Sequence, residues 1–249
     1  MGLERKPQGS LAADVLPAAL HRALTHVFAQ KLSGCMLVGG TALAGYYAGH
    51  RRSDDLDLFT EDDASQKATV LAVKSLRDIG TTCGDERTSA HFYHVTCHLD
   101  GHDFTAQVVL DSNLFEIGSG LLADDSVFVA DLKTLLKMKS ATLVSRGSEK
   151  DLYDLHWLFN QEHELDMPAL IALGTEVDGG MNAEALLTNL VGTALRESAC
   201  DFSLTQKPAA VYAVVTRLQK SLVRGAEIFL RGQPVPPIAT LIRKLRKSR

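Results

Sequence analysis

Residues 36–59 restrict the possible folds of this chain more than any other stretch, because they join two strand-like runs through a turn and a short helix-like run. The first run, residues 35–38, is apolar, has the length of a strand and ends at two glycines. Small residues with helical character follow, and the stretch ends in an alternation of aspartate with leucine. This order predicts a strand, a turn, a helix, a loop and a second strand.

The glycine pair, Gly39 and Gly40, lies at the junction between the first strand and the helix. Glycine lets the backbone approach a ligand closely, and the free N–H groups of a helix that begins near Thr41 attract phosphate. The junction is therefore predicted to bind an anion. A glycine pair before a helix is also common in α/β proteins, so this feature alone is not specific.

Asp55 and Asp57 alternate with Leu56 and Leu58, so on a strand both carboxylates point to one face and both leucines to the core. Two such carboxylates repel each other unless a cation lies between them, and their hard oxygen atoms suit Mg²⁺ or Mn²⁺. The alternative is an ordinary solvated strand face. A phosphate site beside metal-binding carboxylates indicates phosphoryl or nucleotidyl transfer.

The glycine pair and the Asp-x-Asp strand, with fourteen residues between Gly40 and Asp55, resemble the signature of the DNA polymerase beta-like nucleotidyltransferase superfamily. Within it, the run GGTAL, then GHR, Ser53 and the two aspartates resemble the AbiEii/AbiGii toxin family. The resemblance implies an α+β (mixed α/β) nucleotidyltransferase core with a small mixed sheet, followed by a helical C-terminal region. It also implies an NTP substrate and a bacterial toxin–antitoxin system, with a cognate antitoxin as partner.

A second informative block, residues 129–159, predicts two helices. Asp131 is a candidate cap for the first, and a helical wheel places Lys139 in the middle of its apolar stripe, whereas Lys137 faces elsewhere. A lysine that points inward needs an anionic partner. The alternatives are that it extends to the surface or pairs with a structural carboxylate, and we favour a triphosphate.

Ser148 and Asp151 read as a capping box for the second helix, so helix capping is a competing explanation for Asp151. The pairs Met138-Lys139, Arg146-Gly147 and Lys150-Asp151 resemble later motifs of the family. That resemblance implies roles in nucleotide binding for Lys139 and in catalysis for Asp151. Asp154 is a weaker candidate.

Residues 91–111 alternate with period two around Asp100-Gly101, which predicts a β-hairpin. Related folds often place a third carboxylate on such a strand, but the outward mid-strand residue here is Gln107, and aspartates stand only at the strand ends. The number of metal ions therefore stays open. The hairpin aligns His94 and His98 alone, so no zinc site is predicted.

Two local signals concern the scaffold helices of the first half. Residues 14–30 predict one helix, with Pro17 in its first turn, and Asp63 begins an apparent capping box for a helix that continues to Gly80. Both helices are expected to pack against the sheet.

The composition is that of an ordinary globular protein, with 45% hydrophobic residues and a net charge of −4. Four scattered cysteines without a Cys-x-x-Cys pair indicate a reducing compartment, and the absence of a signal-like or membrane-spanning run predicts a cytoplasmic protein. Residues 243–249 form a basic tail.

Together these features predict a nucleotidyltransferase core over residues 1–125 and a helical region over residues 126–249 that contributes Lys139 and Asp151. Asp55 and Asp57 are expected to bind Mg²⁺ or Mn²⁺, and Asp151 to orient or deprotonate the acceptor hydroxyl. The resemblance to the toxin family makes RNA the leading acceptor, in particular tRNA ends, with a protein hydroxyl second. A nucleotide-binding regulator without turnover is the alternative function. The expected nucleotide-binding residues are Gly39, Gly40, Thr41, Arg51, Ser53 and Lys139.

Overall fold

The structure of the chain is a computed structural model that describes residues 2–247, with side chains to residue 244. It divides into two compact units, one made of residues 5–134 and the other of residues 135–247 together with residues 2–4. The sequence-based division at residue 125 lies before the last strand of the sheet, which belongs to the N-terminal unit.

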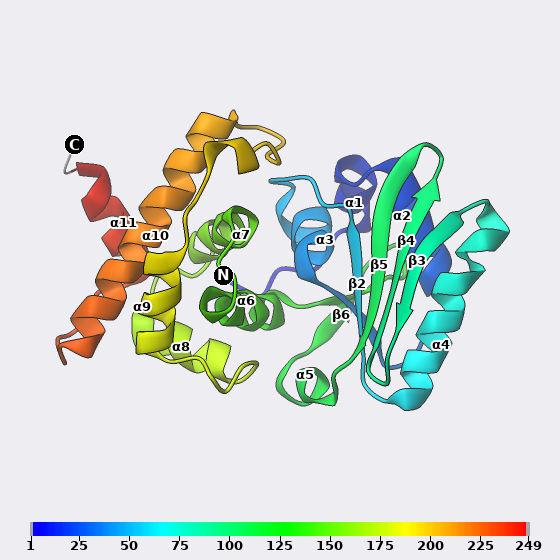
Figure 1. Ribbon diagram of the computed structural model, residues 1–249, viewed down its shortest axis with the longest axis horizontal. Helices are drawn as coiled ribbons and strands as arrows, with labels where there is room; N and C mark the ends of the chain where they lie inside the picture. The colour runs from blue at the N-terminus through cyan, green and yellow to red at the C-terminus, as the bar shows by residue number, and fades with distance from the viewer. Residues whose placement is uncertain (1, 248–249) are drawn as a thin grey trace. The chain divides into compact units, whose positions relative to one another are not determined.

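The N-terminal unit is built on a seven-stranded mixed sheet with the order β3-β4-β5-β2-β1-β7-β6. Figure 1 shows β3, β4, β5 and β2 as neighbours in this sheet. β2 runs parallel to β5 and β1 runs parallel to β7, whereas the other neighbours are antiparallel. This arrangement confirms the predicted mixed α/β fold class. The strands are β1 (Cys35–Val38), β2 (Asp55–Thr60), β3 (Thr82–Thr88), β4 (Phe92–Leu99), β5 (His102–Leu110), β6 (Gly120–Leu122) and β7 (Phe128–Ala130).

One face of the sheet carries the core, because alternate residues of its strands are apolar and buried, such as Leu56 and Leu58 on β2 and Ala106 and Val108 on β5. Helix α4 contacts both of these strands, and α2 contacts β5. The helices of this unit are α1 (Gly9–Val15), α2 (Ala18–Phe28), α3 (Gly39–Leu43), which continues as a π-helix (Ala44–Ala48), α4 (Asp63–Lys74), which continues as a 3₁₀ helix (Ser75–Ile79), and α5 (Ser112–Ile117).

Two local predictions for these helices were wrong. The single helix expected over residues 14–30 is broken, because Leu16 precedes a proline and adopts an extended conformation, and Pro17 then caps α2. The cap of α4 is Asp62 rather than Asp63, since the Asp62 carboxylate accepts a hydrogen bond from the Ser65 N–H at 2.7 Å. Asp63 is the first residue of α4.

The predicted hairpin is confirmed as β4 and β5, which pair antiparallel from Phe92↔Val109 to Leu99↔His102. Its two turn residues, Asp100 and Gly101, have φ of 50° and 78°. Aspartate and glycine are the residues that tolerate such a turn at low cost.

The C-terminal unit is helical, as the sequence predicts, and the long helix α10 contacts α7, α8, α9 and α11. Several of its helices begin at side-chain caps; Ser148 caps α7, and Asp166 and Asn182 cap the next two. No described helix is both long and apolar enough to cross a membrane. The helices are α6 (Leu132–Ala141), which begins in the N-terminal unit, α7 (Glu149–Phe159), α8 (Met167–Thr175), α9 (Ala183–Gly192), α10 (Pro208–Leu230) and α11 (Ile238–Lys247), with short 3₁₀ helices at Thr142–Val144 and Glu197–Ala199.

Candidate functional site

The glycine pair lies where predicted, between β1 and α3, and the structure shows what makes glycine necessary there. Gly39 has φ of 72°, and a Cβ atom at this position would lie 2.1 Å from Oδ2 of Asp57. The Asp57 carboxylate is therefore in direct contact with the backbone of Gly39. The close approach that the glycine permits is to a carboxylate of the neighbouring strand.

We predict that Gly39→Ala lowers the free energy of unfolding by more than about 1 kcal/mol and displaces Asp57, because alanine disfavours positive φ and its methyl group would overlap the carboxylate. Urea denaturation and Mg²⁺ titration measure the two effects. Gly179→Ala is the matched control, since no atom lies within 4 Å of the Cβ it would add. A Gly39→Ala protein with wild-type stability and Mg²⁺ affinity would contradict the assignment.

The residues predicted to hold phosphate also lie together in the N-terminal unit. A Cβ atom at Gly40 would lie 2.5 Å from Nη2 of Arg51 and 3.0 Å from the Ser53 hydroxyl. The Thr41 hydroxyl is 3.0 Å from that of Ser53 and donates to the Asp55 carbonyl oxygen. Thr41, Arg51 and Ser53 are all buried. The loop before β2 is thus tied to the start of α3, next to the two aspartates.

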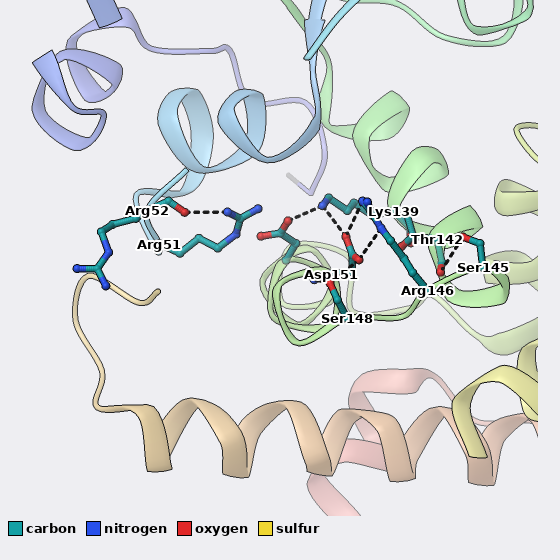
Figure 2. Close-up of polar contacts among 9 residues, drawn as sticks. Arg51, Arg52, Lys139, Thr142, Ser145, Arg146, Ser148 and Asp151 are labelled. Carbon is teal, nitrogen blue, oxygen red and sulfur yellow. Dashed lines mark hydrogen bonds and ion pairs between the residues drawn. The ribbon is translucent and has the colours of Figure 1, made fainter. Parts of the chain in front are cut away.

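Arg51 is held in this cluster by its own backbone neighbour, because its Nη1 donates to the Arg52 carbonyl oxygen at 2.8 Å (Figure 2). A guanidinium is planar and carries its N–H groups in a fixed fork that matches the geometry of phosphate oxygens. Arg51 therefore has the chemistry expected of a phosphate ligand, and this role stays a prediction.

Asp55 and Asp57 lie on the half-exposed face of β2, opposite the buried Leu56 and Leu58. The parallel register with β5 places Thr105 beside Asp55 and Gln107 beside Asp57. The Thr105 hydroxyl donates to Oδ1 of Asp55 at 2.6 Å and so orients that carboxylate.

These donors fit a hard divalent cation, because two carboxylates and the amide oxygen of Gln107 are oxygen ligands at adjacent positions of one sheet face. Within the described part of the chain, no third His, Cys, Asp or Glu joins them to make a larger group. Mg²⁺ commonly takes its remaining ligands from water and substrate phosphates.

The two aspartates at the ends of β5 have other partners. Asp103 accepts a hydrogen bond from Nδ1 of His98 at 2.7 Å, and Asp111 caps α5 by accepting from the Leu114 N–H at 3.0 Å. The strand position next to Asp57 is occupied by a neutral glutamine. A metal ion bound here would therefore be surrounded by two protein carboxylates rather than three.

The C-terminal unit contains a second polar cluster, in which Lys139 of α6 meets two carboxylates of α7 (Figure 2). The Lys139 ammonium is 2.9 Å from Asp151 and 2.7 Å from Asp154, and all three residues are buried. The inward direction that the sequence predicted for Lys139 is confirmed. Its partners in the structure are carboxylates of the same unit, which was the competing explanation, and its role toward phosphate stays a prediction.

Asp151 is the centre of this cluster. It lies 3.0 Å from Nε of Arg146 and accepts from the Ser148 hydroxyl at 2.6 Å, while its own N–H donates to that hydroxyl at 3.3 Å. Burial alone would raise the pKa of Asp151, but Lys139, Ser148 and Arg146 together hold it below the usual value. Asp151 is therefore ionised near neutral pH, and its carboxylate bonds the cap residue Ser148 and pairs with two cations.

Asp154 was a weaker candidate in the sequence, and Thr105 was not predicted. Asp154 lies one helical turn after Asp151, and that spacing was the available signal. Thr105 had none, because its position beside Asp55 depends on a parallel strand register. Lys137, the lysine expected to face elsewhere, is also buried and pairs with Glu176 at 2.5 Å.

The fold agrees with that of a nucleotidyltransferase toxin. MenT4, a nucleotidyltransferase toxin from Mycobacterium tuberculosis H37Rv, superposes with a TM-score of 0.53 at 17% identity, covering 96% of this chain and 99% of that one. A putative nucleotidyltransferase from Helicobacter pylori gives a TM-score of 0.46 at 16% identity, covering 84% and 94% of the two chains.

Sequence comparison identifies the family. The model of the nucleotidyl transferase AbiEii toxin family, described as a type IV TA system, matches residues 22–198. The chain belongs to this family, which confirms the resemblance found in its motifs. An uncharacterized protein of Aquifex aeolicus (strain VF5) is 32% identical over 142 residues, and the match covers 54% of this chain and 61% of that protein. The chain thus spans about three fifths of the length of this curated relative.

Proposed function

We propose that this protein transfers a nucleoside monophosphate from an NTP to a hydroxyl group of RNA, most directly a tRNA end, as the toxin of a type IV toxin–antitoxin pair. The observation that carries the proposal is the arrangement of Asp55 and Asp57 on one face of β2, with Gly39 in contact with Asp57. Family membership supports it. A cognate antitoxin is the proposed protein partner.

In the proposed reaction, the acceptor hydroxyl oxygen forms a bond to the α-phosphorus and the bond to the β-phosphate bridging oxygen breaks. Pyrophosphate leaves with that electron pair, and the hydroxyl proton passes to a carboxylate or to water. Asp55 and Asp57 would hold Mg²⁺ or Mn²⁺, which would supply charge stabilisation to the entering and leaving oxygens when bound.

The remaining residues of the N-terminal cluster have positioning roles in this proposal. Arg51, the backbone of Gly40 and the Ser53 hydroxyl bind the phosphates, because they lie together beside the start of α3. Thr105 fixes the orientation of Asp55 through its hydrogen bond. A carboxylate that is already oriented loses little conformational freedom when it binds its ligand.

Asp151 is better suited to orientation than to proton abstraction. Its lowered pKa, caused by the nearby Lys139, Ser148 and Arg146 against the effect of burial, makes it a weak base. Its proposed role in catalysis is therefore to hold Lys139 and Arg146 in place, and Lys139 remains the proposed nucleotide ligand of the C-terminal unit.

The test is to incubate the purified protein with each α-labelled NTP, Mg²⁺ and total cellular RNA. Label on RNA is the expected result, and label on protein would favour nucleotidylation of a protein hydroxyl. NTP binding without transfer, measured by single-turnover kinetics, would favour the nucleotide-binding regulator. A chelator control shows whether transfer needs the divalent ion.

A further inference from the structure

The open face of the sheet continues beyond Asp55 as a row of residues in register across four strands. Asp55 of β2 pairs with Thr105 of β5, Thr105 pairs with Thr96 of β4, and Thr96 pairs with Gly84 of β3. Residues directly opposite one another in a sheet point to the same face. The row therefore leads from the candidate metal ligand to the edge of the sheet.

A pocket of about 580 Å³ lies over this row, and we call it the Gly84 pocket. Its lining includes the row itself together with Asp54 and Asp103. Pockets for small ligands have volumes of about 300–1,000 Å³, so one nucleoside fits within this size. Because Asp55 lines the pocket, a group bound there lies next to the candidate reaction centre.

The charges of the lining decide what kind of group it accepts. Besides the proposed metal ligand Asp55, the lining contributes the carboxylates of Asp54 and Asp103. Asp103 is hydrogen-bonded to His98 of the same lining, and no Lys or Arg is found among the described lining residues. Such a surface repels polyphosphate but accepts hydrogen bonds from sugar hydroxyl and base amino groups. The phosphate ligands proposed above, Arg51 and Ser53, do not line this pocket.

We infer that the Gly84 pocket binds the terminal ribonucleoside of the RNA acceptor, whose free hydroxyl receives the nucleotide. The inference rests on the proposed transfer to RNA. An NTP carries about four negative charges on the triphosphate attached to its ribose, whereas the terminal nucleoside of an RNA carries one phosphodiester, so the acidic lining favours the acceptor. The Thr82, Thr96 and Thr105 hydroxyls are neutral polar groups of its lining.

Gly84 offers a direct test, because a side chain added there enters the pocket without straining the backbone. Its φ lies outside the left-handed region, and the nearest atom to an added Cβ is the Thr96 hydroxyl at 3.4 Å, an ordinary contact. Gly84→Leu should raise the KM for total tRNA about tenfold or more and leave the KM for NTP unchanged. Gly192→Leu is the control, since the space around its Cβ is empty.

A second measurement does not depend on turnover. Wild-type protein should bind RNA with a 3′-hydroxyl about tenfold more tightly than the same RNA with a 3′-phosphate, because the phosphate would face the carboxylates. Gly84→Leu should abolish this difference. If the difference is found but no transfer occurs, the pocket assignment stands and the proposed function fails.

Two results would overturn the assignment. One is a rise in the KM for NTP alone, which would place the nucleoside of the NTP in the pocket. The other is an unchanged KM for both substrates in a folded Gly84→Leu protein. If that variant does not fold, Thr96→Leu fills the pocket from the neighbouring strand and is judged by the same measurements.

Discussion

Replacing Asp57 by asparagine is expected to lower the rate of nucleotide transfer about a thousandfold while the fold survives. Asparagine keeps the shape of the side chain that rests on Gly39 but removes its charge. A metal ligand contributes several kcal/mol to transition-state stabilisation, and each 1.36 kcal/mol corresponds to about tenfold in rate. Transfer of labelled NTP at saturating Mg²⁺ measures the loss, and circular dichroism checks the fold.

The pair can be tested as a unit. If Asp55 and Asp57 share the metal, each single asparagine variant should remove most of the activity and the double variant should be scarcely worse. Mg²⁺ should raise the Tm of the wild type and not that of the variants, because only the wild type binds it when folded.

The control is Asp78→Asn, which removes an exposed aspartate of the same unit. It should transfer nucleotide at the wild-type rate. Wild-type transfer by a folded Asp57→Asn protein would refute the catalytic assignment and leave the nucleotide-binding regulator as the better function.

The Lys139→Ala variant is expected to lose about 3–5 kcal/mol of stability and to bind NTP more weakly than Lys137→Ala. Removing Lys139 leaves two buried carboxylates, Asp151 and Asp154, without their shared cation. Lys137→Ala is the matched control, because its partner Glu176 has a side chain 42% exposed that water can solvate. Urea denaturation and equilibrium NTP binding measure the two effects.

A compensating variant separates the structural role of Lys139 from its role toward phosphate. Lys139→Met combined with Asp154→Leu removes one charge of each sign and should recover much of the lost stability. If Lys139 binds phosphate, this double variant should still bind NTP weakly. Recovery of NTP affinity together with stability would show that Lys139 has a structural role and does not bind phosphate.

The same cluster predicts how stability depends on pH. The pKa of Asp151 is lowered in the folded state, mainly by Lys139 acting against the effect of burial, so its stabilising contribution is present above its unfolded pKa near 4. That contribution is lost as the pH falls through the folded pKa. Without Lys139 the folded pKa rises, and acid unfolding should begin at a higher pH.

Features that depend on a few neighbouring residues were readable in the sequence. The alternation of Asp55 to Leu58 requires only the two-residue period of a strand, and the caps Asp131 and Ser148 bond N–H groups three residues further along the chain. The hairpin turn at Asp100-Gly101 is equally local. The family motifs lie in such stretches, so the sequence alone is enough to show the resemblance.

Predictions from local sequence were wrong where two neighbouring residues or patterns favoured different structures. A continuous apolar stripe favoured one helix through Pro17, but the restriction that proline imposes on Leu16 was stronger and split it. Asp62 and Asp63 are adjacent and equally able to cap α4, and only the backbone of Asp62 takes the extended conformation that a cap requires.

The sequence by itself determined which residues carry charge and which way they point from their own strand or helix, because side-chain direction follows from local backbone geometry. Only the tertiary structure decided which residues each charged side chain contacts. Gln107 lies beside Asp57 because β5 pairs with β2 in one particular register, and Lys139 meets Asp154 because α6 packs against α7. Strand register and helix packing are set by the burial of many distant apolar side chains at once, and no single stretch of the sequence encodes them.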